Sequence, residues 1–249
     1  MEFVSARAKV KGYLEGENVI LGSTVIGDGS LIGRNVIVGY PTRTSIKSFQ
    51  FQESFSIGEF DQISKGSKVG RNCVIRSGTV IYETATLGDD VQTGHGVLIR
   101  EGSLVGERSR IGSSTQLDGT VKIGRNVIIQ SNAYLPHLTI VEDEVFIAPN
   151  VCLTNDPYPY SSRLAGVSVG RGAAVGANSC IIAGVKIGER AMVAAGSVVT
   201  RDVPPNVVVA GNPARFHRMR KEYDEKKLSW EESGKLTRKN IELKKKNAV

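Results

Sequence analysis

Three side chains in this chain could act as a general base: His95, His137 and Asp156. His95 lies between two glycines, in Thr93-Gly94-His95-Gly96, which leaves room for a ligand beside the imidazole. Asp156 belongs to the polar stretch Thr154-Asn155-Asp156-Pro157-Tyr158. A positioned imidazole or carboxylate can take the proton of an attacking nucleophile. Whether these groups can act together depends on the elements that position them.

An aliphatic residue at every sixth position is the dominant pattern of the chain. From Ile63 to Leu153, fifteen of sixteen such positions hold Ile, Val or Leu, and Thr93 is the departure. Six is a multiple of the two-residue strand period and does not fit the 3.6-residue helical period. Intervening Gly and Asn favour turns. The pattern predicts a solenoid of short strands with the aliphatic row inside. An all-β sandwich would need turn signals about 8–12 residues apart.

Two interruptions of this register predict excursions from the solenoid. The step from Val38 to Ile63 is 25 residues and the step from Leu153 to Val169 is 16, and neither is a multiple of six. Insertions in repeat proteins often shape the binding face. We expect the two loops at residues 40–62 and 154–168. The first loop holds four phenylalanines, for which we expect local packing: Phe49, Phe51, Phe55 and Phe60.

The charge of the chain is concentrated at one end. Residues 213–249 hold twelve Lys/Arg and six Asp/Glu, so they carry +6 of the net +7. Pro213 suits the first turn of a helix. Interleaved acidic residues favour a solvated, salt-bridged helix over a nucleic-acid-binding or membrane-binding tail. We therefore expect a solenoid domain at residues 1–212 and a helical tail at residues 213–249.

The cysteines and the hydropathy of the chain indicate the cellular compartment in which we expect the protein. The chain has three cysteines, which we expect to be buried free thiols: Cys73, Cys152 and Cys180. Their spacing fits neither a metal site nor a disulfide framework, which favours a reducing cytoplasm. A run of about 18 apolar residues and a signal-peptide pattern are both absent, so we expect no membrane association.

Two C-terminal motifs within this repeat resemble the hexapeptide acyltransferases. They are Ala194-Ala195-Gly196-Ser197-Val198-Val199-Thr200-Arg201-Asp202-Val203-Pro204 and Gly211-Asn212-Pro213-Ala214-Arg215. The resemblance implies an all-β fold, a left-handed parallel β-helix with three hexapeptides per coil. It also implies acetyl-CoA as acyl donor, a homotrimer with sites between subunits, and no metal. Left-handedness rests on the resemblance alone, because parallel crossovers are usually right-handed.

Further stretches resemble the branch of that family that N-acetylates amino sugars on nucleotide diphosphates. They are Gln130-Ser131-Asn132, residues 145–151 and residues 153–159. The resemblance implies a nucleotide-linked amino sugar as substrate. Branches that acetylate sugar hydroxyls commonly carry a His in this loop, where the present chain has Asn155-Asp156. O-acetylation and a longer acyl donor remain alternatives.

The resemblance also suggests where acetyl-CoA binds. Small residues let backbone groups approach the pantetheine arm of acetyl-CoA, and arginines suit the phosphates of the same molecule. The residues so implied are Ala183, Gly184, Ala195, Gly196, Arg201 and Arg215.

Eighteen residues per coil would stack residues eighteen apart about 4.8 Å from one another. His137 then lies below Asn155, whereas His95 falls in a different column and 42 residues away. We do not expect both imidazoles to reach one reacting atom. We favour His95 as the base because Thr93 breaks the inward row beside it, with His137 and Asp156 as alternatives. The expected substrate-binding residues are Asn132, Asn155 and Tyr158.

Two rival functions remain open. A γ-carbonic-anhydrase-like protein would need three histidines around zinc, and the third histidine of the chain is His217, in the tail. A non-catalytic scaffolding β-helix would not need the C-terminal Ala-Ala-Gly-Ser motif or the loop at residues 154–168.

Overall fold

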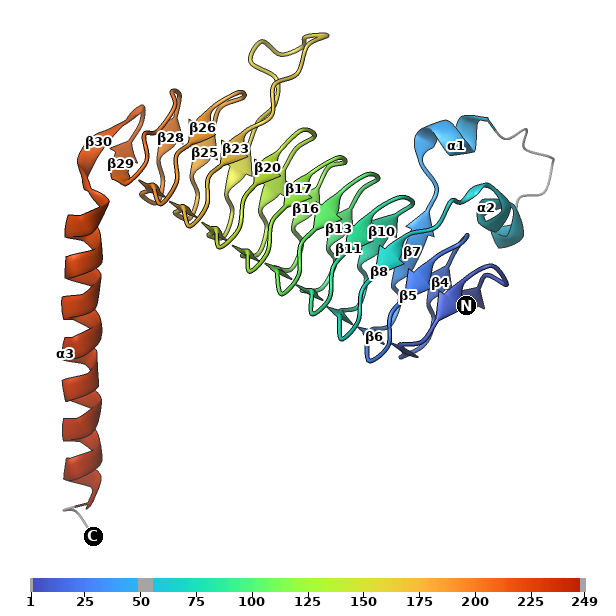
Figure 1. The fold of residues 1–249 in the computed structure, drawn as a ribbon, viewed down its shortest axis with the longest axis horizontal. Coiled ribbons are helices and arrows are strands. Elements are labelled where there is room, and N and C mark those ends of the chain that lie inside the picture. Colours follow the sequence, from blue (N-terminus) through green and yellow to red (C-terminus); the bar gives the residue numbers. More distant parts are fainter. Residues whose placement is uncertain (1, 49–55, 247–249) are drawn as a thin grey trace.

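The computed structural model is a parallel β-solenoid that ends in one long helix (Figure 1). It describes residues 2–48 and 56–246, with side chains as far as residue 234. The chain visits three parallel sheets in turn, here called A, B and C.

Each coil places one strand in each sheet. Sheet A contains β1 (Phe3–Val4), β4 (Val19–Ile20), β7 (Ile37–Tyr40), β10 (Val80–Tyr82), β13 (Leu98–Ile99), β16 (Gln116–Leu117), β19 (Tyr134–Leu135), β22 (Cys152–Leu153), β25 (Cys180–Ile181) and β28 (Val198–Val199). Sheet B contains β2 (Lys9–Val10), β5 (Val25–Ile26), β8 (Lys68–Val69), β11 (Thr86–Leu87), β14 (Leu104–Val105), β17 (Lys122–Ile123), β20 (Ile140–Val141), β23 (Ser168–Val169) and β26 (Lys186–Ile187). Sheet C contains β3 (Tyr13–Leu14), β6 (Leu31–Ile32), β9 (Val74–Ile75), β12 (Gln92–Thr93), β15 (Arg110–Ile111), β18 (Ile128–Ile129), β21 (Phe146–Ile147), β24 (Ala174–Val175), β27 (Met192–Val193), β29 (Val207–Gly211) and β30 (Ala214–Met219).

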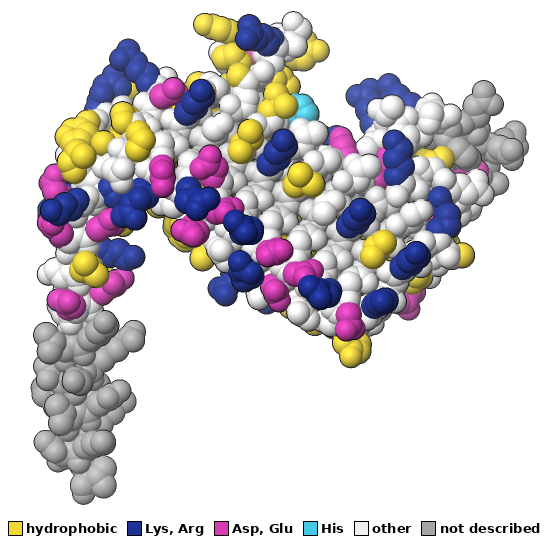
Figure 2. All heavy atoms as spheres, viewed as in Figure 1, with side chains coloured by type: hydrophobic (Ala, Val, Ile, Leu, Met, Phe, Trp, Pro, Cys, Tyr) yellow, Lys and Arg dark blue, Asp and Glu magenta, His cyan; other side chains and the backbone are white. Residues whose placement is uncertain are grey.

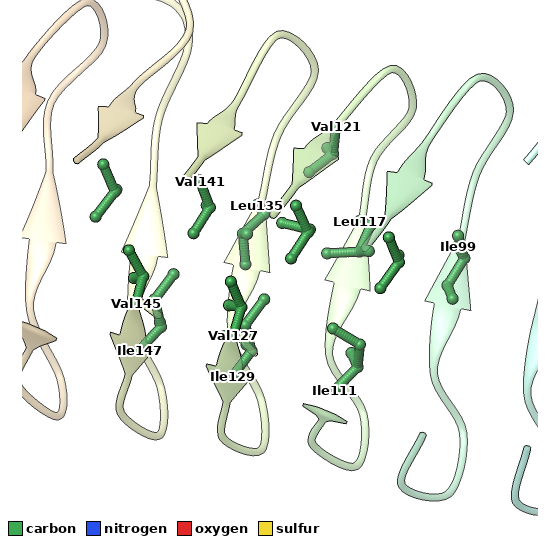
Figure 3. Packing of buried hydrophobic residues seen from close by; sticks show 14 of the residues in the cluster. Ile99, Ile111, Leu117, Val121, Val127, Ile129, Leu135, Val141, Val145 and Ile147 are labelled. Atoms are coloured by element: carbon green, nitrogen blue, oxygen red, sulfur yellow. The ribbon is translucent and has the colours of Figure 1, made fainter. Parts of the chain in front are cut away.

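The aliphatic row forms the core, as the six-residue period predicts. Strands of neighbouring coils pair residues eighteen apart, as Ile81 does with Ile99 and Ile99 with Leu117. Each inward side chain therefore stacks on its counterpart in the next coil, as Figure 3 shows for Ile99 and Leu117, and all three are fully buried. The solenoid of hexapeptide coils is confirmed. Its left-handed winding stays a prediction.

The limits of the solenoid differ from those expected from the register. Ile63 belongs to helix α2 (Ile57–Ile63), so the long regular run begins at Val69 instead. At the N-terminus, β1, β2 and β3 already form a first coil, in which Val4 pairs with Ile20. The register misses this coil because its strands in sheets A and B precede those of the next coil by 16 residues rather than eighteen.

The first excursion is anchored by a buried carboxylate. It contains helices α1 (Arg43–Lys47) and α2, and leaves after β7. Glu83, 1% exposed, accepts hydrogen bonds from the backbone N–H groups of Thr42 and Lys65, both at 2.8 Å. The Phe60 ring lies 5.5 Å from that of Tyr40, which agrees with local packing. The other three phenylalanines of this loop, Phe49, Phe51 and Phe55, lie outside the described residues.

The C-terminal helix begins later than Pro213. Residues 214–219 form β30, which pairs antiparallel with β29 around the turn at Asn212-Pro213. Helix α3 (Arg220–Lys246) follows and projects from the end of the solenoid (Figure 1). Its salt bridges include Lys227–Glu231, one turn apart at 3.8 Å, as expected for a solvated helix. The division of the chain at residue 212 stays a prediction.

The cysteines are less buried than expected. Cys73 is buried, whereas Cys152 is exposed and Cys180 half-buried. The last two each precede an inward residue by one position, so strand alternation turns them outward. Among the described helices, none is both long and apolar enough to cross a bilayer.

Candidate active site

The two candidate histidines lie at different edges of the solenoid. His137 lies between β19 of sheet A and β20 of sheet B, an edge here called the AB edge. His95 lies between β12 of sheet C and β13 of sheet A, at the CA edge. Within one chain they therefore belong to separate sites, in agreement with their spacing in the sequence.

Both excursions leave the solenoid at the AB edge. The first lies between β7 and β8, and the second occupies residues 154–167, between β22 and β23. The second projects far from the body of the solenoid (Figure 1). The AB edge therefore combines an imidazole with a loop long enough to cover a ligand.

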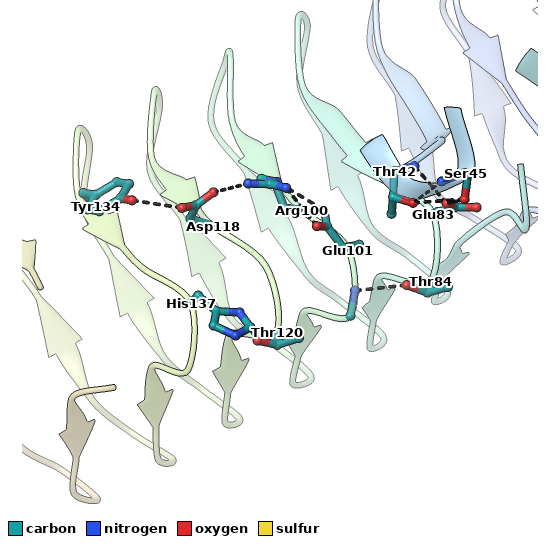
Figure 4. Close-up of polar contacts among 11 residues, drawn as sticks. Thr42, Ser45, Glu83, Thr84, Arg100, Glu101, Asp118, Thr120, Tyr134 and His137 are labelled. Atoms are coloured by element: carbon teal, nitrogen blue, oxygen red, sulfur yellow. Dashed lines mark hydrogen bonds and ion pairs between the residues drawn. The ribbon is translucent and has the colours of Figure 1, made fainter. Parts of the chain in front are cut away.

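His137 is held by two contacts at this edge. Its Nδ1 lies 2.6 Å from Oγ1 of Thr120, one coil away (Figure 4). The side-chain amide of Asn155 donates a 3.2 Å hydrogen bond to the carbonyl oxygen of His137. The predicted stacking of Asn155 over His137 is thus confirmed. Thr120 was not foreseen, because it is an ordinary turn residue without a motif.

The base of the second loop is closed by backbone hydrogen bonds. Ala165 N donates to Asn155 O at 2.7 Å, and Gly184 N donates to Ala165 O at 3.0 Å. These contacts fix the two ends of the loop on the coil that contains Gly184. The loop therefore starts from a defined position directly beside His137.

Asp156 is engaged inside the same loop. Its carboxylate accepts hydrogen bonds from Tyr158 N (3.0 Å) and from both the backbone N–H (3.0 Å) and the hydroxyl (2.8 Å) of Ser161. The Ser161 backbone hydrogen bond is the main reason that the pKa of Asp156 is lowered. This carboxylate thus holds the loop in shape and is ill suited to take up a proton near neutral pH.

The loop carries exposed aromatic side chains. Tyr158 is 81% exposed and Tyr160 is fully exposed, and Figure 2 shows hydrophobic side chains gathered on this projection. Tyr158 therefore stands away from His137 and Asn155 rather than closing a pocket with them in a single chain.

A polar network on the outer face of sheet A approaches the AB edge. Arg100 pairs with Asp118 (2.8 Å) and Glu101 (2.8 Å), and the Tyr134 hydroxyl donates to Asp118 at 3.0 Å (Figure 4). Burial, together with that hydrogen bond, raises the pKa of Tyr134 to about 12. The network keeps these side chains ordered next to the His137 coil. The repeat pattern gave no signal for it, because outward positions vary freely.

His95 and Asn132 lie together at the CA edge, apart from Asn155. Both are exposed, and both follow sheet C strands. His95 lines an open groove of about 400 Å³ over sheet C. The predicted substrate-binding residues therefore split between two edges of the chain.

The residues expected to bind acetyl-CoA fall into three places. Ala183 and Gly184 lie at the AB edge, next to the loop base, and Ala195 and Gly196 at the CA edge. A side chain at Gly196 would meet nothing within 4 Å, so the backbone there is open to a ligand. Two guanidinium-bearing residues line one hollow of about 200 Å³ beside β29 and β30: Arg201 and Arg215. This pair suits a phosphate group.

Within the described residues, no group of three His, Cys, Asp or Glu side chains is arranged to hold a metal ion. His217 lies in β30, where its Nε2 contacts Arg218 at 2.6 Å.

Comparison with known proteins agrees with the repeat. Residues 101–136 and 166–201 match the profile described as the hexapeptide repeat of succinyl-transferase. These two segments therefore carry the hexapeptide repeat. The first matched segment ends one residue before His137, and the second includes Ala183 and Gly184.

Two relatives of this chain are named as acetyltransferases. It is 37% identical over 115 residues to YJL218W of Saccharomyces cerevisiae, which is provisionally named an acetyltransferase; the match covers 40% of this chain and 59% of that protein. It is 34% identical over 109 residues to the galactoside O-acetyltransferase of Escherichia coli, covering 37% and 54%. The chain thus spans less than two thirds of the length of these relatives.

A solved structure shares the fold. The UDP-N-acetylglucosamine acyltransferase of Campylobacter jejuni superposes with a TM-score of 0.52 over 84% of this chain and 73% of its own, at 18% identity. At that identity the likeness concerns the architecture of the hexapeptide solenoid.

Proposed function

We propose that this protein is an acetyl-CoA-dependent acetyltransferase whose acceptor is the amino group of a nucleotide-linked amino sugar. The observation that carries the proposal is the arrangement at the AB edge. There His137 is oriented by Thr120 and lies beneath a loop anchored through Asn155. Named acetyltransferases among its relatives support the reaction class.

His137, rather than His95, is the base in this proposal. We assign the Nδ1 proton of His137 to its 2.6 Å contact with the Thr120 hydroxyl oxygen, which would leave the lone pair of Nε2 for the substrate. His95 has no corresponding side-chain partner among the described residues, and no loop covers it. These contacts support His137 over His95, the base that the break at Thr93 favours in the sequence, and the choice of base is part of the proposal.

The chemistry follows from these roles. Nε2 of His137 removes a proton from the ammonium of the amino sugar, and the freed amine attacks the thioester carbonyl carbon of acetyl-CoA. The carbon–sulfur bond then breaks, the imidazolium returns its proton to the departing thiolate, and the nitrogen releases its second proton to solvent, so that the products are the amide, the thiol of CoA and one proton. A backbone N–H would stabilise the intermediate oxyanion. Asp156 shapes the loop and does not itself exchange protons.

Acetyl-CoA is proposed to bind along the C-terminal coils. Arg201 and Arg215 would contact its phosphates, and the open backbone at Gly196, next to the small residue Ala195, would allow the pantetheine to approach. Since these residues and His137 occupy different edges, a homotrimer that joins the AB edge of one subunit to the CA edge of the next would complete the site. The trimer and the cytoplasmic location remain predictions.

A second candidate is O-acetylation of a sugar hydroxyl. It is favoured by the 34% identity to galactoside O-acetyltransferase. The loop of the present chain, however, offers Asn155 and Asp156 and no histidine. An alcohol needs a stronger base than a free amine does, which favours the amine as acceptor.

An acceptor panel distinguishes these activities. Acetyl-CoA is incubated with the protein and with nucleotide-linked amino sugars, free amino sugars, or galactosides, and free thiol is followed. Thiol release with the amines alone supports N-acetylation, whereas release with galactosides alone supports the second candidate. The transferase proposal is wrong if no acceptor releases thiol and calorimetry detects no binding of CoA.

A further inference from the structure

We propose that the groove over sheet C is a phosphate-binding site, built around Arg76 and Arg110 and separate from the His137 edge of the same chain. The groove crosses several coils and has an open volume of about 400 Å³. Its lining includes two arginines and His95 but no Asp or Glu. For the source of the phosphate, the inference rests on the function proposed above.

Thr93 accounts for the position of Arg76. One coil further on, Gly94 N donates to Ile111 O at 2.6 Å, the ordinary ladder bond of this fold. Arg76 N donates instead to the hydroxyl of Thr93, at 3.0 Å. The Thr93 carbonyl is thereby free to accept a 2.6 Å hydrogen bond from Nη1 of Arg76. An aliphatic residue at position 93 has no hydroxyl, so the departure from the inward row holds this guanidinium over the groove.

Arg110 supplies a second cation, which has no acidic partner among the described residues. It lies on β15, where it pairs in register with Gln92 and with Ile128. Arginines at the BC edge, between sheets B and C, do have acidic partners. Arg71 pairs with Asp89 at 2.6 Å, and Arg125 and Arg171 share Asp143. Arg110, which lacks an acidic partner, and Arg76, which is held by a backbone carbonyl, could both donate hydrogen bonds to one phosphate.

The floor of the groove provides an apolar surface next to these cations. Ile128 and Phe146 pair in register on neighbouring strands and remain 37% and 39% exposed. Strand spacing of about 4.8 Å places Arg110, Ile128 and Phe146 in one row. The hydroxyls of Ser113 and Ser131 border the row at the CA edge. The site therefore suits a phosphate attached to a flat or apolar body.

The groove continues toward the BC edge. An adjoining hollow of about 610 Å³ shares Gln92, Arg110 and Ile128 and adds Arg108 and Asp90. Arg108 is already engaged by Asn126 (2.9 Å) and Glu107 (3.5 Å). Asp90 makes no ion pair with Arg110 among the described residues, so Arg76 and Arg110 are the two arginines of these hollows that lack an acidic partner.

Two phosphate sources fit this chemistry: the diphosphate of a nucleotide-linked acceptor and the phosphates of CoA. Calorimetric titration of the full chain with UDP and, separately, with CoA distinguishes them. We expect Arg110→Gln to weaken the binding of one of the two at least tenfold, with a reduced dependence on salt. Thr93→Val should weaken the binding of the same ligand, because the substitution removes the hydroxyl that positions Arg76.

Arg171→Gln is the matched control, since Arg171 is exposed and lies outside the groove. If Arg110→Gln binds UDP more weakly, the groove is assigned to the acceptor; if it binds CoA more weakly, the groove is assigned to the donor. The inference is overturned if Arg110→Gln binds both ligands as tightly as the unmodified chain. Thiol release with a free amino sugar reports on the transferase activity independently, so failure of this inference can be told from failure of the proposed function.

Discussion

The Oγ1 atom of Thr120 lies 2.6 Å from Nδ1 of His137, although the two residues belong to successive coils. Their contact arises because the solenoid stacks positions about one coil apart in the sequence. It orients the imidazole immediately beneath the loop that begins at Thr154. The proposed catalytic base is therefore positioned by the regular part of the fold, while the irregular part supplies its cover.

Replacing Thr120 by Val should slow catalysis without weakening substrate binding. The substitution keeps the shape of the side chain but removes the oxygen that contacts Nδ1, so the imidazole loses the partner that orients it. We expect kcat to fall about tenfold, with KM nearly unchanged. Thr86→Val, on sheet B, is the control. A kcat equal to that of the unmodified chain would remove Thr120 from the mechanism.

Replacing Asp156 by Asn should loosen the loop without unfolding the solenoid. Because hydrogen bonds, first that from Ser161 N, lower the pKa of Asp156 in the folded chain, its contribution is present above the ordinary Asp value of about 3.9 and is lost as pH falls through the lowered pKa. Chymotrypsin should therefore cleave the variant faster after Tyr160, whereas Pro159 protects the bond after Tyr158 in both proteins. Asp28→Asn is the control. Equal cleavage rates in both variants would show that Asp156 does not hold the loop.

Replacing Glu83 by Ala should destabilise the chain by about 2–5 kcal/mol, because several donors lose a buried acceptor at about 1–3 kcal/mol each. Burial raises the pKa of Glu83, but hydrogen bonds from Ser45, Thr42 and Lys65 outweigh it and leave the pKa lowered. The stabilisation is thus complete above about pH 4.3 and disappears as pH falls through the lowered value.

Urea unfolding at neutral pH measures the Glu83 effect, with exposed Glu189→Ala as control. The two variants should differ mainly in the midpoint of unfolding. A Glu83→Ala midpoint equal to that of the unmodified chain would mean that the excursion is anchored elsewhere.

Much of the fold could be predicted from the sequence because the interior of a solenoid has one strict requirement. Each inward position, such as Ile99 or Leu117, must pack against its counterpart eighteen residues away. The same regularity predicted that Asn155 stacks over His137. It also marked Thr93 as unusual, although the reason, its hold on Arg76, required coordinates.

Outward-facing features could not be predicted in this way. Neither Thr120 nor the Arg100–Asp118–Tyr134 network obeys the repeat, because outward side chains are not constrained by the core. The sequence predicts a helix from Pro213, where residues 214–219 form β30 instead, since Pro213 suits both a turn and a first helical position. Which edge carries the site also depended on the loop contacts rather than on the spacing of the histidines.

The most direct test of the account is the turnover of His137→Gln, measured as thiol release from acetyl-CoA with a nucleotide-linked amino sugar. His217→Gln is the control, since that side chain lies outside both the proposed active site and the groove. The account predicts that kcat falls about 10²–10⁴-fold for His137→Gln and is unchanged for His217→Gln, while His95→Gln affects KM at most. A His137→Gln enzyme with normal kcat would contradict it, most clearly if His95→Gln were inactive instead.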